Sequence, residues 1–358
     1  MSAIHSPDDP ALDDLCRQLA EFAPALDLPN AWPAKQLALC GAAGVFAWFV
    51  PERLGGQGWP AVDLLRAYAT LAAACLTTTF VITQRMGAVS RIVGGQSDAA
   101  RALLLPDLVS GRSFATVGIS HLTTSRQHLA GPVLSAVEQS DGSFVLTGYS
   151  PWVTGAEHAQ HIVLGATLPD ERQILVALPT ALSGVTIEPA PQLVGLAASR
   201  TGAVRFDQVL VERRWLLAGP VREVMKQGIG GQTGGLQTSA LAVGLASAAI
   251  RYLTEQSHDR GQLASAAAAL QTEIAALASD LWQVAAGASP CTSDDIRSRA
   301  NSLALRAAQA ALAAAKGAGY VVGHPAGRWC REALFFLVWS CPRDVLAANL
   351  CELAGIGD

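Results

Sequence analysis

The stretch Gly148-Tyr149-Ser150-Pro151-Trp152-Val153-Thr154-Gly155-Ala156 lies in the middle of the β-rich part of this sequence. It places a large aromatic face two residues from a hydroxyl group, on strand-like backbone bounded by glycine turns. Such a pair can stack on a planar heterocycle and hydrogen-bond its edge. A tryptophan at the end of a strand is more often a core residue, so the stretch alone leaves both interpretations open.

Short runs rich in valine, isoleucine and phenylalanine surround this stretch, and Asp-Gly, Leu-Pro, Ala-Pro and Ser-Gly turn signals separate them. The expected strands cover residues 113–120, 143–147, 161–166, 172–178, 184–188 and 203–211. Together they predict a β-domain over residues 113–217, compatible with a small barrel or sandwich.

Helical sequence lies on both sides of this β-domain. Before it, apolar residues recur at helical spacing from Leu12 to Phe22, and further helices are expected over 61–74 and 98–110. The predicted N-terminal helical domain covers residues 1–112.

After Pro220 the chain is rich in alanine and strongly periodic. Helices are expected over 236–257, 264–286 and 293–316, followed by a Gly/Pro loop over 317–327 and a last helical region over 328–353. Long helices of small residues suit a close-packed bundle, so residues 218–358 are predicted to form a C-terminal helical bundle. The predicted fold class is therefore α+β and multidomain.

Composition argues against several classes of function. The net charge is -4 and the basic residues form no stripe, so no nucleic-acid partner is expected. The apolar run 236–250 is interrupted by Gln237, Thr238 and Ser239, which argues against a membrane span. The polar, acidic start and seven cysteines without a Cys-x-x-Cys pair predict a cytoplasmic protein with reduced thiols. His158 and His161 have no third ligand nearby, so no metal site is expected.

Six motifs, in order along nearly the whole chain, resemble those of the acyl-CoA dehydrogenase flavoprotein family. They are the loop Pro51-Glu52-Arg53-Leu54-Gly55-Gly56-Gln57-Gly58, the strand end Gly118-Ile119-Ser120-His121-Leu122, the opening turn Gly148 to Gly155, the segment Gly195-Leu196 to Val211, the pair Arg260 and Gln271, and the run Gly317-Ala318-Gly319-Tyr320 to Arg331-Glu332-Ala333. One such match would carry little weight, but six in the same order are specific.

The resemblance implies an N-terminal helical domain, a central β-barrel and a C-terminal four-helix bundle, with FAD bound between barrel and bundle. By the same resemblance, Trp152 and Val153 would lie beside the isoalloxazine ring, and Thr154 would bond its N5 edge. Ser120 would serve the pyrimidine side, and Ser125 would lie near the diphosphate.

In this family the residues corresponding to Arg260, Gln271, Gly317 and Gly319 reach the FAD of a neighbouring subunit. A guanidinium suits a pyrophosphate because its fork binds phosphate oxygens at low conformational cost. The resemblance therefore implies a homodimer or homotetramer, which agrees with a charged content of only 15%.

The catalytic base of the family is missing at its expected position. Counting from Arg331-Glu332-Ala333 places the family's glutamate at Ser340, and a serine hydroxyl is too weak a base unless another group activates it. The second position that the family uses falls in residues 233–237, which contain no carboxylate. His121 is the remaining acid–base candidate, although a structural loop histidine is the commoner case.

Three functions remain open. The first is a flavin-dependent oxidoreductase acting on an acyl thioester or related small molecule, with an unassigned electron acceptor. The second is a flavin-dependent monooxygenase on the same fold, which needs no carboxylate because its substrate need not lose an α-proton. The third is a non-catalytic or half-site subunit that pairs with a homologous chain.

Overall fold

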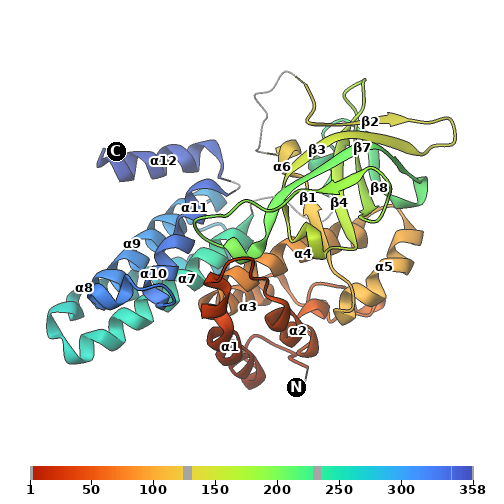
Figure 1. Cartoon of the computed structure of the whole chain (residues 1–358). Coiled ribbons are helices and arrows are strands. Elements are labelled where there is room, and N and C mark those ends of the chain that lie inside the picture. The colour runs from red at the N-terminus through yellow and green to blue at the C-terminus, as the bar shows by residue number, and fades with distance from the viewer. Residues whose placement is uncertain (1–2, 124–130, 229–234, 340, 357–358) are drawn as a thin grey trace.

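The computed structural model describes residues 3–123, 131–228, 235–339 and 341–356, and its helices flank a central sheet (Figure 1). The N-terminal helices are α1 (Pro10–Phe22), α2 (Ala34–Ala42), α3 (Ala61–Ala74), α4 (Leu76–Gly94) and α5 (Asp98–Ser110). The Asp9 side chain accepts a hydrogen bond from the Ala11 amide and so caps α1, while Ser97 caps α5 in the same way. The predicted helical character of this part of the chain is confirmed.

Within the described residues, eight strands form one sheet. They are β1 (Ala115–Gly118), β2 (Leu134–Glu138), β3 (Phe144–Thr154), β4 (His161–Thr167), β5 (Gln173–Pro179), β6 (Val185–Ile187), β7 (Thr201–Val211) and β8 (Leu216–Val221). Their order is β6-β7-β3-β2-β4-β5-β8, with β1 paired to β4. The two longest strands, β3 and β7, run antiparallel, so that Thr154 pairs with Thr201 and the Trp-Val-Thr triplet ends a central strand.

The main differences between the sheet and the expected strands are at four places. Strand β3 continues to Thr154, beyond the expected end at residue 147. Strand β2 was not expected because its five residues include serine and glutamate, and it is stabilised by pairing with β3. Strand β8 contains a Gly-Pro pair that is typical of a turn, and it ends at Val221, beyond the expected domain boundary at residue 217. The expected strand over 113–120 is shorter, because the chain turns into helix α6 (Ser120–Thr123).

The C-terminal helices are α7 (Leu236–Asp259), α8 (Ala264–Ala285), α9 (Ser293–Gly319), α10 (Pro325–Ala333), α11 (Phe335–Val338) and α12 (Arg343–Ala354). A capping box between Thr292 and Asp295 begins α9. The expected loop over 317–327 is shorter than predicted, since α9 continues to Gly319 across a non-helical residue, Lys316. The last expected helical region is divided into α10, α11 and α12.

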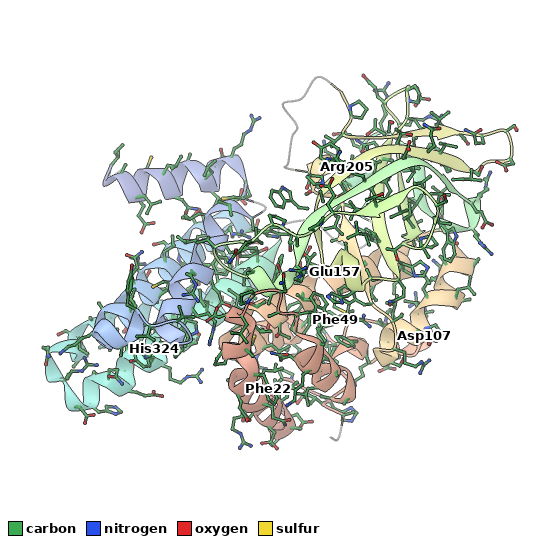
Figure 2. The ribbon with its side chains drawn as sticks, viewed as in Figure 1. Phe22, Phe49, Asp107, Glu157, Arg205 and His324 are labelled. Carbon is green, nitrogen blue, oxygen red and sulfur yellow. The ribbon has the colours of Figure 1, made fainter. Side chains whose placement is uncertain are left out.

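Helix α4 lies between the sheet and the helices α3 and α7. It packs against β1 on the sheet side and against α3 and α7 on the helical side, and it runs directly beneath the strands (Figure 1). Phe49 lies between the N-terminal helices and the sheet (Figure 2). None of the helices in the described residues is long and apolar enough to cross a membrane.

Candidate functional site

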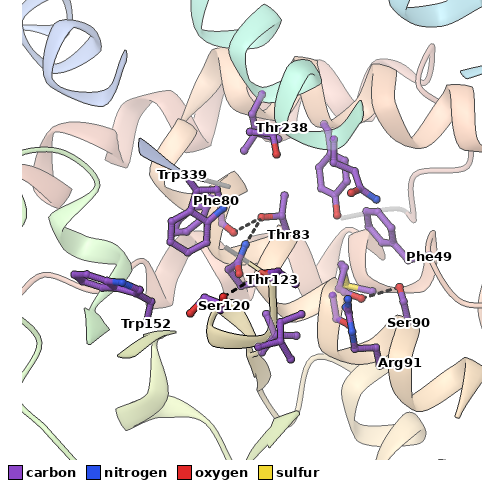
Figure 3. A pocket seen from close by; sticks show the side chains of 18 of the residues that line it. Phe49, Phe80, Thr83, Ser90, Arg91, Ser120, Thr123, Trp152, Thr238 and Trp339 are labelled. Atoms are coloured by element: carbon purple, nitrogen blue, oxygen red, sulfur yellow. Dashed lines mark hydrogen bonds between the residues drawn. The ribbon is translucent and has the colours of Figure 1, made fainter. Parts of the chain in front are cut away.

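A cavity of about 130 Å³, here called the helical cavity, lies where α4, β1, α6 and the first turn of α7 meet (Figure 3). Its lining includes Phe49, Tyr68, Phe80, Thr83, Gln84, Gly87, Ser90, Arg91, Ser120, Trp152, Thr238 and Trp339. Several of these residues come from one face of α4, because positions 80, 83, 87, 90 and 91 repeat at helical spacing. The same face therefore carries an aromatic ring, hydroxyl groups and a guanidinium into one cavity.

A second cavity of about 340 Å³, here called the interdomain cavity, lies between the ends of β3 and β7 and helices α10 and α11. Its walls are mostly apolar, and Ser199 and Thr201 add hydroxyl groups. The two cavities share five lining residues, which are Phe80, Ser120, Trp152, Phe335 and Trp339. A ligand lying against these residues would contact both the sheet and the helices.

At this junction Trp152 has an exposed ring face and Ser120 has a hydroxyl without a hydrogen-bond partner in the described residues. Trp152 is 39% exposed and forms no aromatic pair within the described part of the chain. The Ser120 Oγ atom is buried and has no hydrogen-bond partner in the same residues. A buried polar atom without a partner is costly, so this hydroxyl suits a ligand that supplies one. An open aromatic face next to a free hydroxyl fits the edge and face of a flavin ring.

The other two residues of the triplet lie deeper. Val153 is fully buried, and Thr154 is 1% exposed with its hydroxyl 2.9 Å from that of Thr201. The Thr201 hydroxyl is also 2.8 Å from that of Ser199, which lines the interdomain cavity together with Thr201. Thr154 lines neither cavity. Its hydroxyl is connected to the interdomain cavity through the hydroxyl of Thr201.

His121 lies outside both cavities. Its Nε2 atom donates a hydrogen bond of 2.8 Å to the Gly165 carbonyl of β4, and its Nδ1 atom is buried without a partner in the described residues. Burial lowers the pKa of His121, opposed by the hydrogen bond to Gly165. The side chain is therefore held neutral at physiological pH and attaches α6 to the sheet.

No aspartate, glutamate or histidine of the described residues lines either cavity. Ser340 and Ser125 lie outside the described residues. A neighbouring depression contains Asp27 and Glu332, and another, on the outer side of Trp152, contains Glu188. Burial raises the pKa of Glu332, which accepts a hydrogen bond of 2.9 Å from Thr77, and Asp27 pairs with Arg331 at 2.9 Å. These contacts join α10 to the N-terminal helices.

The four predicted cofactor residues of the bundle lie away from Trp152. Arg260 directly follows α7 and donates a hydrogen bond of 2.7 Å to the Ala314 carbonyl and another to Gln256. Gln271 is exposed on α8, while Gly317 and Gly319 end α9. Figure 1 places α8 at the far end of the bundle from β3. Within one chain, these residues are not brought together with the cavities.

Sequence reasoning missed the contribution of α4 and of Trp339. The available signal was the repeat of Thr83, Ser90 and Arg91 at helical spacing in the expected helical region before residue 112. Trp339 directly precedes the expected base position, and its ring stacks on Phe335 with centroids 5.4 Å apart. Its aromatic neighbours could be found only once the helices had been placed in space.

The comparisons with known proteins point to acyl-CoA dehydrogenases over most of the chain. Residues 11–112 match the family model "Acyl-CoA dehydrogenase, N-terminal domain". The chain is 25% identical to a probable acyl-CoA dehydrogenase of Bacillus subtilis over 88% of each chain, and 24% identical to the mitochondrial short-chain specific acyl-CoA dehydrogenase of Rattus norvegicus over 90% of this chain and 84% of that one. Its fold is similar to that of FkbI, a protein for biosynthesis of a methoxymalonyl extender unit, with a TM-score of 0.81 at 21% identity over 97% of this chain and 99% of FkbI.

The predicted order of helices, strands and helices is present, and the motif-bearing turn lies at a cavity between the sheet and the helices. The family model and the full-length relatives name the same family. Residues 11–112 therefore carry the N-terminal domain of the acyl-CoA dehydrogenases, and the chain as a whole is similar to these FAD-dependent oxidoreductases.

Proposed function

We propose that this protein binds FAD with its isoalloxazine ring against Trp152 and Ser120, and that it oxidises a small acyl thioester or a related small molecule. The observation that carries this proposal is the open face of Trp152 beside the buried, unpartnered Ser120 hydroxyl, at the junction of two cavities. A bound flavin accepts a hydride at N5 and, when reduced, can react with oxygen.

The protein's own residues would orient the substrate and exclude water. Phe80, Phe335 and Trp339 form an aromatic cluster that lines both cavities, so polar groups would bind in surroundings of low dielectric constant. Gln237 and Thr238 come from the first turn of α7, whose amide groups give that end of the helix a partial positive charge. A thioester carbonyl placed there would be polarised.

A flavin monooxygenase is the second candidate, and it has an observation of its own. No carboxylate or histidine of the described residues lines either cavity. Removal of an α-proton needs such a base, whereas oxygenation does not. The loss of the family's base at Ser340 also favours this candidate, and it stays a prediction from the sequence because Ser340 lies outside the described residues.

Flavin binding beyond the ring would need a second subunit. We propose that Arg260, Gln271, Gly317 and Gly319 contact the FAD of a neighbouring chain in a homodimer or homotetramer, with Thr154 and Val153 behind the ring and Ser125 near the diphosphate. Light scattering with and without FAD, compared with an Arg260→Gln variant, tests this arrangement. A monomer that binds FAD as tightly as the assembled protein would contradict it.

Absorbance spectroscopy of the purified protein tests the main proposal. We expect a flavin spectrum, or its appearance on adding FAD, and loss of affinity in a Trp152→Ala variant. Anaerobic bleaching by butyryl-CoA would support dehydrogenation. Substrate-dependent oxygen consumption with supplied reduced flavin, without such bleaching, would favour the monooxygenase. A protein that neither contains nor binds flavin would refute both.

A further inference from the structure

Arg91 is a buried cation with little hydrogen bonding of its own. It is 4% exposed, and its Nη1 atom donates a hydrogen bond of 2.8 Å to the Gly87 carbonyl, one turn earlier in α4. The Nε atom has no partner among the described residues, and no ion pair within them includes Arg91. The guanidinium lines the helical cavity, at the opposite end from Trp152 (Figure 3).

Other buried arginines show how this fold satisfies a guanidinium that has a structural role. Arg85, on the same helix, donates to the Leu108 carbonyl and, at 2.6 Å, to that of Ser113, and it lies 4.0 Å above the Phe46 ring. Arg297 similarly donates to a side-chain amide and a backbone carbonyl. Arg85 Nε and Arg297 Nη1 are also without partners, but each of these arginines donates two hydrogen bonds and reaches at least one other segment. The hydrogen bond of Arg91 goes only to a carbonyl of its own helix, so its guanidinium is the less satisfied.

The cavity around Arg91 contains no negative charge. None of the described lining residues is acidic, and residues 124–130, 229–234 and 340 contain no aspartate or glutamate in the sequence. Burial lowers the pKa of Arg91 to about 10, which leaves the group charged at neutral pH. An unpaired buried cation is strongly unfavourable until an anion binds beside it.

We propose that Arg91 binds a carboxylate at the end of the substrate remote from the flavin, so that the substrate is a small thioester or related molecule with a free carboxyl group. The guanidinium fork matches a carboxylate with two parallel hydrogen bonds. Tyr68 lines the same cavity and carries a further hydroxyl donor. The small volume of about 130 Å³ limits the acid to a short chain.

This inference rests on the proposed function, and the experiment separates the two. FAD-loaded wild-type protein is titrated calorimetrically with succinyl-CoA and with butyryl-CoA, which have acyl groups of equal carbon number with and without a carboxylate. We expect wild type to bind succinyl-CoA at least about thirtyfold more tightly than butyryl-CoA. The Arg91→Met variant should bind both equally, because it can no longer form the buried charge pair with the carboxylate. Arg91→Lys should retain part of the preference for succinyl-CoA.

Arg85→Met is the matched control, since it removes an equally buried guanidinium from the same helix outside the cavity. It should lower the apoprotein Tm but preserve the preference for succinyl-CoA. The apoprotein Tm of Arg91→Met should equal or exceed that of wild type, because an unpaired buried charge is replaced by an apolar side chain. A Tm as low as that of Arg85→Met would assign Arg91 a structural role and overturn the proposal.

Two further outcomes distinguish a failure of the proposed function from a failure of the carboxylate subsite. If wild type binds neither thioester, the thioester part of the proposed function is wrong. The carboxylate subsite is then tested by the Tm shift with succinate against succinamide. Equal effects of these two probes, or an Arg91→Met variant that still prefers the acid, would overturn the subsite. Weakened FAD binding in Arg91→Met, with the acid preference unchanged, would instead assign the guanidinium to the cofactor.

Discussion

Replacing Trp152 with alanine should weaken flavin binding far more than it weakens the fold. The side chain is 39% exposed, and a tryptophan buries roughly 150–250 Å², so a stacked ring would cover about 60–100 Å² of it. At roughly 25 cal/mol per Å² this contributes about 1.5–2.5 kcal/mol, and favourable aromatic geometry adds about 0.5–1.5 kcal/mol. The expected loss of about 2–4 kcal/mol corresponds to a Kd about 30- to 1000-fold higher.

The assay is a titration of apoprotein with FAD, followed by the change in flavin fluorescence, together with the Tm of each apoprotein. Trp152→Phe retains an aromatic face and should recover much of the affinity. Trp59→Ala is the control for folding, because Trp59 is 9% exposed, stacks on Trp48 with centroids 4.2 Å apart, and lines neither cavity. It should lower the Tm more than Trp152→Ala does. Wild-type affinity in Trp152→Ala, or a loss of affinity explained by unfolding, would refute the reasoning.

Three further predictions concern the scaffold. Gly244→Ala should destabilise the protein by about 1–3 kcal/mol in urea unfolding, because the added Cβ would lie 2.3 Å from the Ala69 carbonyl oxygen between α7 and α3; unchanged stability would contradict that close packing. Burial lowers the pKa of His121 in the folded protein. As the pH falls below about 6.5, the unfolded chain therefore takes up the His121 proton before the folded chain does, and the free energy of unfolding decreases. His121→Gln, whose amide can still donate to Gly165, should lose less stability than wild type between pH 7.5 and 5.5. Burial raises the pKa of Cys16 to about 12 and of Cys75 to about 11, so both thiols should resist Ellman's reagent at pH 8 until the protein unfolds; rapid labelling of the native protein would refute this.

Much of the architecture could be predicted because it depends on local patterns. The alanine-rich periodicity of α7, α8 and α9 identified three long helices, and alternating apolar runs located most of the strands. The errors occurred where pairing overrides local preference. Strand β2 is stable only beside β3, and β8 forms around a Gly-Pro pair because β5 lies next to it.

The candidate site was predicted in part. The structure places Trp152 and Ser120 together at one cavity junction. It places Thr154 behind Thr201 and attaches His121 to Gly165, outside both cavities. Burial and hydrogen-bond partners depend on residues far along the chain, and spacing within a motif does not contain that information.

The sequence by itself determined the general order of helices, then strands, then helices, and the short segment that carries Trp152 within the β-rich part, because each depends on residues close together in the chain. Only the tertiary structure decided what surrounds that segment. It brought one polar face of α4 beneath the sheet and left Arg91 in a cavity without an acidic partner. The physical reason is that the energy of a buried charge is set by its neighbours in space, and those neighbours come from β1, α6 and α7 as well as from its own helix.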